Sequence, residues 1–228
     1  MTGLVARVVA LAAAVTLLAV PVAEAGVACR WFGRCLYESA GFTIFVVDKA
    51  TGAAVEGVHA MAEWVMYAHG RRNGPLMVQD AMSDVAGKVT FPAWGPIRGG
   101  REGLVLNTDP AITLFKPGYK VLIVWNAFPV GADETDRHRT FVQDGKVVAM
   151  EPFQGTAEQW LEELYKAAYP AVKGSSSDDQ IARFRAEYLR RRRQVWTEIQ
   201  KLSLDSRDFH NRKDSFERNL KYLEDLKP

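Results

Sequence analysis

Three stretches of sequence decide the fold of this chain: VDKATGAAVEGV at residues 47–58, SDVAGKVTF at residues 83–91 and FKPGYK at residues 115–120. Each places Gly, Asp or Pro where a chain must reverse, with strand-forming residues on either side. Gly52 and Gly87 can take the positive φ that tight turns need, and Pro117 followed by Gly118 suits a type II turn. Together the three stretches predict a small β-sandwich.

The segments around these turns alternate in polarity as strands do. In residues 58–67 one face of a strand would carry Val58, Ala60, Ala62, Trp64 and Met66, and the other His59, Met61, Glu63, Val65 and Tyr67. Period-two alternation makes the first, purely apolar set the predicted core face. Residues 42–47, 88–91, 111–115 and 119–125 are further predicted strands. Because no stretch between them is long enough for a helical crossover, we expect antiparallel pairing.

The remaining segments of this half are predicted to be turns and loops. Asp144 and Gly145 lie between residues 140–143 and 146–150, and this dipeptide predicts a two-residue β-hairpin. Residues 69–75 are expected to form a polar loop, residues 79–86 a short turn-rich segment, and residues 92–102 the longest loop.

Candidate partner contacts in these loops are Arg71, Arg72, Trp94, Arg98 and Arg101. Loops carry binding residues more often than strands do. Trp94 lies in a loop rich in Pro and Gly, where an exposed indole can stack on a sugar or on a partner protein. The alternative is a packed side chain, which is the commoner state of aromatic residues in such loops.

The three stretches resemble the carboxypeptidase regulatory-like domain, a small prealbumin-like (transthyretin-like) sandwich. That family typically shows V-x-D-x-x-T-G-x-x-V-x-G-A-x-V, then T-D-x-x-G-x-F-x-F, then a corner like K-x-G-Y. The matching positions are Val46, Asp48, Thr51, Gly52, Val55 and Gly57, then Ser83, Asp84, Gly87, Val89 and Phe91, then Lys116, Gly118 and Tyr119. Val58 and Ala60 depart from the first pattern. The resemblance covers residues 42–126 and implies a fold, not a reaction.

The N-terminus has the features of an export signal. Arg7 precedes an apolar run over residues 8–20, Pro21 breaks the run, and Ala23-Glu24-Ala25 supplies the small-x-small pattern that signal peptidase needs. We expect cleavage after Ala25. The alternative is an uncleaved anchor, although the apolar run is shorter than the roughly 20 residues of a membrane span.

Two cysteines, Cys29 and Cys35, follow the expected cleavage site. In an oxidising compartment a lone pair this close most simply forms one disulfide. Its short loop stabilises only modestly but ties down an end that otherwise frays. The alternative is a lipid-bearing Cys29, which has the small residue Ala28 before it but lacks a leucine three residues upstream.

The pattern becomes helical after residue 152. Residues 156–159 (TAEQ) and 177–180 (SDDQ) are capping boxes that predict two helix starts, and Tyr169-Pro170 ends the first helix. Two apolar stripes follow at helical spacing: Ile181, Phe184, Tyr188, Val195, Ile199 and Leu202, and then Phe209, Phe216, Leu220 and Leu223.

The most unusual run is Arg190, Arg191, Arg192 and Arg193. Four successive residues wrap a full helical turn, so they cannot all face one partner. One interpretation is a solvated helix paired with Glu187 and neighbouring acids, where each surface pair stabilises little. The other is contact with anionic lipid headgroups or an acidic partner protein, because polybasic clusters near membranes bind them.

The sequence shows no convergent catalytic set. His59, His69, His138 and His210 lie in different segments, no H-x-x-E motif occurs, and we interpret each histidine as a solvated or partly packed residue. His59 and Glu63 share a predicted strand face about 13 Å apart, too far for one metal ion. Nucleotide-binding and serine-hydrolase motifs are absent. We expect no metal and no cofactor.

The sequence therefore predicts an exported, periplasmic or secreted α+β protein. Its expected parts are a signal peptide (1–25), a cysteine-containing segment (26–41), an antiparallel β-sandwich (42–152) and a helical extension (153–228). We expect a non-catalytic envelope module that binds a protein or a glycan. The alternatives are an envelope-assembly subunit that uses its basic helices at a membrane, and then a hydrolase. A net charge of +2 and export disfavour a nucleic-acid partner.

Overall fold

The computed structural model describes residues 36–68, 71–98, 104–105, 109–127, 138–168 and 178–227. The expected signal peptide, the expected disulfide or lipid at Cys29 and Cys35, and Arg101 lie outside these described residues. The strands are β1 (Leu36–Ser39), β2 (Phe42–Asp48), β3 (His59–Ala68), β4 (Arg71–Met82), β5 (Lys88–Phe91), β6 (Trp94–Arg98), β7 (Leu104–Val105), β8 (Ala111–Phe115), β9 (Leu122–Trp125), β10 (His138–Arg139) and β11 (Val147–Met150). The helices are α1 (Ala157–Ala168), α2 (Asp178–Arg183), α3 (Arg185–Gln200) and α4 (Arg207–Asp225).

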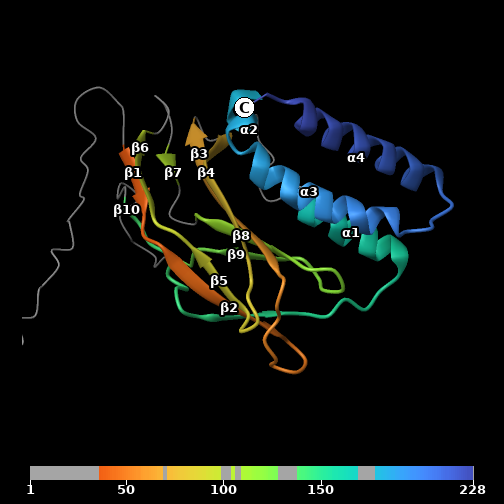
Figure 1. Cartoon of the computed structure of the whole chain (residues 1–228), viewed down its shortest axis with the longest axis horizontal. Coiled ribbons are helices and arrows are strands. Elements are labelled where there is room, and N and C mark those ends of the chain that lie inside the picture. Colours follow the sequence, from red (N-terminus) through yellow and green to blue (C-terminus); the bar gives the residue numbers. More distant parts are fainter. Residues whose placement is uncertain are drawn as a thin grey trace, which may run out of the picture.

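Within the described residues the strands pair in three sheets, of order β10-β1-β6, β11-β2-β5 and β4-β3-β8-β9, with β7 added beside β3. The first two sheets face the third across a common apolar core, which makes the strand half a β-sandwich. The helices lie over the outer face of the β4-β3-β8-β9 sheet (Figure 1). The chain is therefore built in three layers: sheet, sheet and helices.

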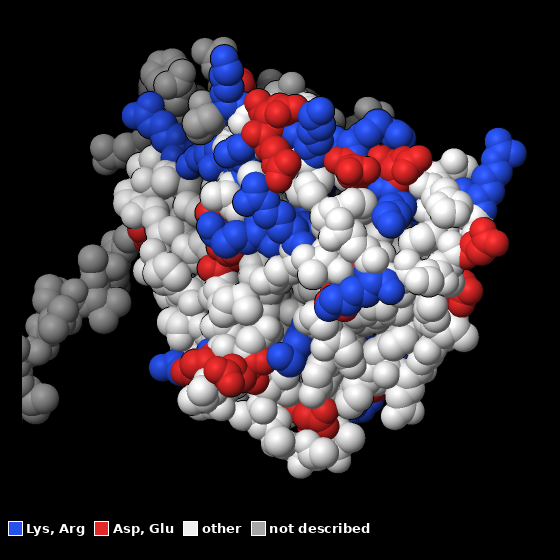
Figure 2. All heavy atoms as spheres, turned by 45° about the vertical axis from the view of Figure 1, so that its right-hand side comes forward, with Lys and Arg blue, Asp and Glu red and all other residues white. Residues whose placement is uncertain are grey.

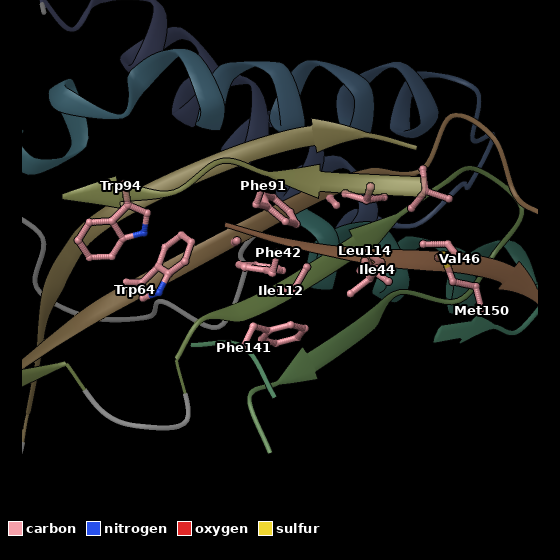
Figure 3. Packing of buried hydrophobic residues seen from close by; sticks show 14 of the residues in the cluster. Phe42, Ile44, Val46, Trp64, Phe91, Trp94, Ile112, Leu114, Phe141 and Met150 are labelled. Carbon is pink, nitrogen blue, oxygen red and sulfur yellow. The ribbon is translucent and has the colours of Figure 1, made fainter. Parts of the chain in front are cut away.

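The core between the sheets is filled by alternate residues of the facing strands. Val58, Ala60, Ala62, Trp64 and Met66 are all buried there, which confirms the predicted core face of residues 58–67. The opposite layer contributes alternate residues of β2, because the strand shows the burial pattern of period two. Figure 3 shows the buried side chains in a row that runs from the two tryptophans at one end to Val46 and Met150 at the other.

The predicted hairpin around Asp144 and Gly145 is wrong. β11 pairs in parallel with β2, and β10 pairs in parallel with β1, whereas the other strand pairs, including β2 with β5 and β1 with β6, are antiparallel. The turn itself forms, but it is bound to β2: Thr43 N donates to Asp144 Oδ1 (2.7 Å), and Gly145 N donates to Thr43 O (2.7 Å). The two turn residues thus attach this segment to β2 by hydrogen bonds, and they do not connect two strands of a hairpin.

Two predicted loops are in fact strands. Residues 71–82 form β4, the long partner of β3, although Asn73-Gly74-Pro75 predicts a loop. The ladder shifts register at Val65 and Pro75, and β4 is the edge strand of its sheet, where a proline costs no ladder hydrogen bond. Residues 94–98 form β6, which pairs with β1 and is also an edge strand.

The three sequence stretches that predicted the sandwich meet at one end of it. Asp48 Oδ1 accepts from the backbone of Ala50 and Thr51 (both 2.8 Å), and its Oδ2 accepts from the Tyr119 hydroxyl (3.0 Å). Gly87 joins the same corner, because its carbonyl accepts from Val46 N (2.8 Å). The motif residues therefore form hydrogen bonds with the backbone of the turns and with one another.

The predicted helix start at residues 156–159 is confirmed. Thr156 N donates to Gln159 Oε1 (2.9 Å) and Gln159 N donates to Thr156 Oγ1 (3.4 Å), which is the reciprocal pair of a capping box. The predicted apolar stripe of the last helix is also confirmed, since Phe209, Phe216, Leu220 and Leu223 are all buried on α4. Among the described residues, each helix is too short or too polar to cross a membrane.

Gly87→Ala should destabilise the sandwich far more than Gly52→Ala. Both glycines have a positive φ, +72° at Gly87 and +73° at Gly52. A Cβ at Gly87 would lie 2.3 Å from Val46 O, whereas one at Gly52 would meet nothing within 4 Å. We expect a loss of at least about 2 kcal/mol for Gly87→Ala and about 1 kcal/mol for Gly52→Ala. Urea unfolding of both variants measures the difference, and equal losses would contradict the crowded corner.

Candidate functional site

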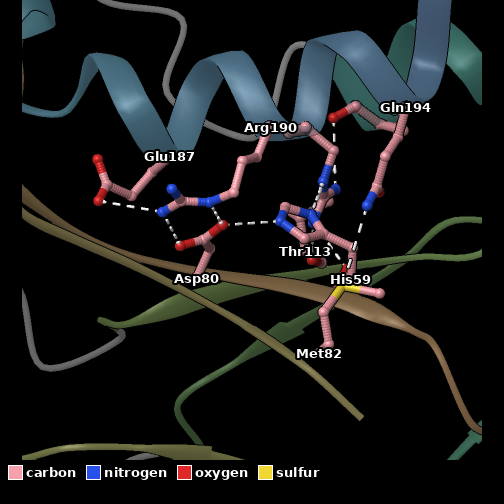
Figure 4. A network of polar contacts seen from close by, with 9 residues as sticks. His59, Asp80, Met82, Thr113, Glu187, Arg190 and Gln194 are labelled. Carbon is pink, nitrogen blue, oxygen red and sulfur yellow. Dashed lines mark hydrogen bonds and ion pairs between the residues drawn. The ribbon is translucent and has the colours of Figure 1, made fainter.

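Polar side chains gather where α3 crosses the outer face of β3 and β4. The sequence predicts that this face of β3 is solvated or partly packed, yet His59 is 2% exposed and Glu63 is fully buried. Asp80 reaches the same place from β4, and Arg190 and Arg191 reach it from α3 (Figure 4). We call these five residues the polar clasp. Three of its members, His59, Glu63 and Arg191, are buried, whereas the side chain of Arg190 is 54% exposed.

His59 is held at both ring nitrogens. Its Nε2 lies 2.9 Å from Asp80 Oδ2, and its Nδ1 lies 2.5 Å from Arg191 Nε. Because a guanidinium can only donate, Nδ1 must accept and the ring proton must sit on Nε2, where it is donated to the carboxylate. Burial lowers the pKa of His59 and outweighs the hydrogen bond to Asp80, so the imidazole is neutral. Neither nitrogen is left to exchange a proton with a substrate.

Arg191 is fully buried and joins four elements. Besides His59 Nδ1, its guanidinium donates to the carbonyl oxygens of His59 on β3 and Thr113 on β8 (both 2.8 Å), and it approaches that of Ala167 on α1 (3.5 Å). The guanidinium also lies 5.8 Å from the ring centroid of Phe115. Burial lowers the pKa of Arg191 to about 9, so the side chain stays charged at neutral pH.

Asp80 links the histidine to the next arginine. Arg190 binds the Asp80 carboxylate through two hydrogen bonds of 2.6 Å each, and a further bond of 3.3 Å joins Arg190 to Glu187. Burial alone would raise the pKa of Asp80. The hydrogen bonds from Arg190 and His59 outweigh burial and hold that pKa well below its usual range. Asp80 is therefore an anion throughout the physiological range.

Glu63 is the second acid of the clasp. Its Oε1 accepts a hydrogen bond from the Tyr188 hydroxyl (3.1 Å), which brings the first turn of α3 onto β3. Burial and the negative charge of Glu63 raise the pKa of Tyr188, so the phenol remains a neutral donor. Glu63 and Asp80 thus lie opposite Arg190 and Arg191, with a neutral imidazole between the charged groups of Asp80 and Arg191.

The four arginines do not face one partner, as the helical geometry predicts. Arg190 and Arg191 contact the β4-β3-β8-β9 sheet, as described above. Arg192 Nη1 approaches the carbonyl of Asn219 (3.5 Å), and Arg193 donates to the Glu224 carboxylate (2.9 Å), both on α4. On the face shown in Figure 2, basic and acidic side chains lie among one another along the upper part. The run thus connects layers of its own chain.

Of the other candidate contact residues, those within the described part of the chain lie at the opposite end of the sandwich from the Asp48 corner. Trp94 is only 8% exposed and packs edge-on against Trp64 with ring centroids 5.2 Å apart, so the packed alternative is the observed one. Arg98, at the end of β6, is exposed. Arg71 and Arg72 begin β4, and their backbones pair with the last two residues of β3 at the tip of this hairpin.

The clasp residues that sequence reasoning missed are His59, Glu63 and Asp80. One signal was present, because ionisable residues alternating with Met61 and Val65 suggest a strand face that is only partly solvated. What covers that face depends on α3, more than 100 residues later, and no local pattern contains that information. In the described part of the chain, no three His, Cys, Asp or Glu side chains are placed to share a metal ion.

No protein-family model and no curated protein matches this chain. Among solved structures the chain is similar to the group B streptococcus pilus 2b backbone protein, at 15% identity and a TM-score of 0.27 over 50% of this chain and 41% of that one. It is also similar to a streptococcal ancillary pilin (20% identity, TM-score 0.27, 53% and 31%) and to the major pilin SpaD from Corynebacterium diphtheriae (10%, 0.27, 52% and 30%). This chain spans less than half the length of each.

Arg191→Met should destabilise the fold strongly, whereas Arg193→Met should not. Removing the Arg191 guanidinium leaves Glu63 and Asp80 short of one counter-charge inside the protein, at a cost of about 3–5 kcal/mol. Arg193 is 61% exposed and its ion pair with Glu224 lies at the surface, so its loss costs less than about 1 kcal/mol. Denaturant unfolding of the two variants tests the contrast, and similar midpoints would show that the clasp does not hold the layers.

Proposed function

We propose that this chain is an exported, non-catalytic module of the cell envelope that presents one end of a rigid sandwich to a partner. The observation that carries this proposal is the state of the polar clasp. Among the described residues, His59 and Asp80 are suited to acid–base chemistry, but they are 2% and 9% exposed and are bound to Arg191 and Arg190 across a layer interface. Such a group joins layers and has no open side for a substrate.

Export is supported by the sequence features of residues 1–25, and it is compatible with a cysteine pair that forms a disulfide after secretion. We keep the division into residues 1–25, 26–41, 42–152 and 153–228 as part of the proposal, with the observation that β1 of the second segment pairs with β6 of the sandwich. A lipid anchor at Cys29 is the alternative attachment, and the mass of the mature protein distinguishes the two.

Assignment of the sandwich to the carboxypeptidase regulatory-like domains is also a proposal. It is supported by the contacts of its motif residues, because Asp48, Gly87 and Tyr119 come together at one corner. In this assignment the corner has a structural role. The partner would then bind at the other end of the strands, where chain length and loop sequence differ from the family pattern.

The proposed contact surface is this other end, which carries the β3–β4 hairpin tip and β6. Arg71 and Arg72 lie at the hairpin tip and Arg98 at the end of β6, and Arg101 follows closely in sequence. Several arginines at one end favour a partner with acidic groups, either an envelope protein or an acidic glycan. Trp94 packs inside this end and is not part of the surface.

Reversing the charges at this end should weaken partner binding. We expect the Arg71→Glu, Arg72→Glu, Arg98→Glu variant to retain envelope partners about tenfold more weakly, which equals about 1.4 kcal/mol. The matched control reverses three exposed charges of α4, Arg207→Glu, Arg218→Glu and Lys221→Glu. Pull-down from envelope extracts, with and without glycan digestion, measures both variants.

The reverse result, loss of binding only in the α4 variant, would favour the assembly-subunit alternative. Deleting the helices is not a suitable test, because α3 and α1 bury the outer face of the β4-β3-β8-β9 sheet. Catalysis has its own test: a hydrolase screen in which folded Asp80→Asn protein loses the turnover of the native chain would contradict the non-catalytic proposal.

A further inference from the structure

The two ends of the helical layer are attached to the sheet with different strength. At one end α1, the second half of α3 and the first half of α4 share a large apolar cluster with Phe115 of β8. At the other end only Met61, Val78 and Phe184 are buried together between sheet and helices. We call residues 178–191 and 218–227 the distal end of the helical layer. Besides this small cluster, the polar clasp attaches the distal end to the sheet.

The distal end is nevertheless a unit in itself. Leu189, Leu220 and Leu223 form a cluster that joins α3 to α4, and Ile181 of α2 packs against it. Arg185 donates to the carbonyl oxygens of Leu223 (2.6 Å) and Glu224 (2.5 Å), which satisfies the C-terminal end of α4. These contacts do not involve the sheet, so they would survive if the distal end moved away from it.

His59 is the titratable group at the centre of this attachment. The charged and titratable groups that face it are Asp80 from β4, Glu63 from β3, and Glu187, Tyr188, Arg190 and Arg191 from α3. β8 and α1 contribute the carbonyl oxygens of Thr113 and Ala167, and β8 also contributes the uncharged ring of Phe115. The unprotonated nitrogen of the imidazole, Nδ1, thus accepts a hydrogen bond from a guanidinium.

We infer that the polar clasp is an acid-sensitive latch, which releases the distal end of the helical layer from the sandwich when His59 takes up a proton. The proton from solvent binds Nδ1, the acceptor for Arg191 Nε–H, and turns it into a second donor. Two donors and two positive charges then face each other in a buried site. Arg191 must withdraw, and with it go its bonds to the carbonyl oxygens of β3 and β8.

The direction of the pH response follows from the depressed pKa of His59. Its folded pKa lies below the ordinary value of 6.5, so the open state binds the proton first as the pH falls. The contribution of the clasp is complete above about pH 6.5 and is lost as the pH falls toward the folded pKa. Asp80 stays charged in this range, because its pKa is held far below it. This inference goes beyond the proposed function and does not depend on it.

Amide hydrogen exchange of the full chain, followed from about pH 8 to about pH 5 and corrected for the intrinsic pH dependence, tests the latch. We expect exchange at residues 178–191 and 218–227 to speed up by about tenfold per pH unit below the unfolded pKa of His59, while β2, β3 and β8 stay protected. Equal acceleration in strands and helices, or no acceleration, would overturn the inference.

His59→Gln is the diagnostic variant, because glutamine keeps one donor and one acceptor but does not titrate in this range. It should show exchange that is independent of pH, whereas the control His210→Gln, at an exposed position of α4, should behave as the native chain. A His59→Gln protein that still opens in acid would overturn the latch. If His59→Gln does not fold, imidazole ¹⁵N shifts of the native chain decide: opening while His59 remains neutral would equally overturn it.

Discussion

The structure depends on one buried positive charge. The guanidinium of Arg191 has no exposed surface, and its donors reach β3, β8 and α1 while its backbone belongs to α3. Such a charge is tolerated inside a protein only when its donors are satisfied and opposite charges lie near. Both conditions are met by groups from four elements distant in sequence. The position of the helices on the sandwich is therefore specified by polar geometry as well as by apolar contact.

The other arginines of the run extend this arrangement. Arg190 attaches the exposed side of α3 to β4 through Asp80, while Arg192 and Arg193 turn toward α4. A single turn of α3 thus contacts both the sheet and α4, because successive residues of a helix project about 100° apart. A polyarginine run of this kind resembles a surface-binding motif in sequence, but here each of its guanidinium groups contacts other groups of the same chain.

One end of the sandwich has a structural role, and the other end carries the proposed contact surface. The corner built from Asp48, Gly87 and Tyr119 uses its polar atoms on turns, and a side chain at Gly87 would collide with the neighbouring strand. The β3–β4 hairpin tip and β6 lie at the far end of the same strands. Between the ends the outer face of β3 carries the clasp, where the sandwich and the helical layer meet at the proposed latch.

The sequence by itself determined the local features: the turns, the inner face of β3, the capping box of α1 and the buried stripe of α4. Each depends on residues a few positions apart, and short-range periodicity and backbone preference encode such features. The tertiary structure alone decided that β11 runs parallel to β2, that β4 tolerates Pro75 at a sheet edge, and that His59 and Arg191 meet. These outcomes depend on which segments become neighbours. The same residues are solvated or buried, and act as a surface or as a latch, according to what packs against them.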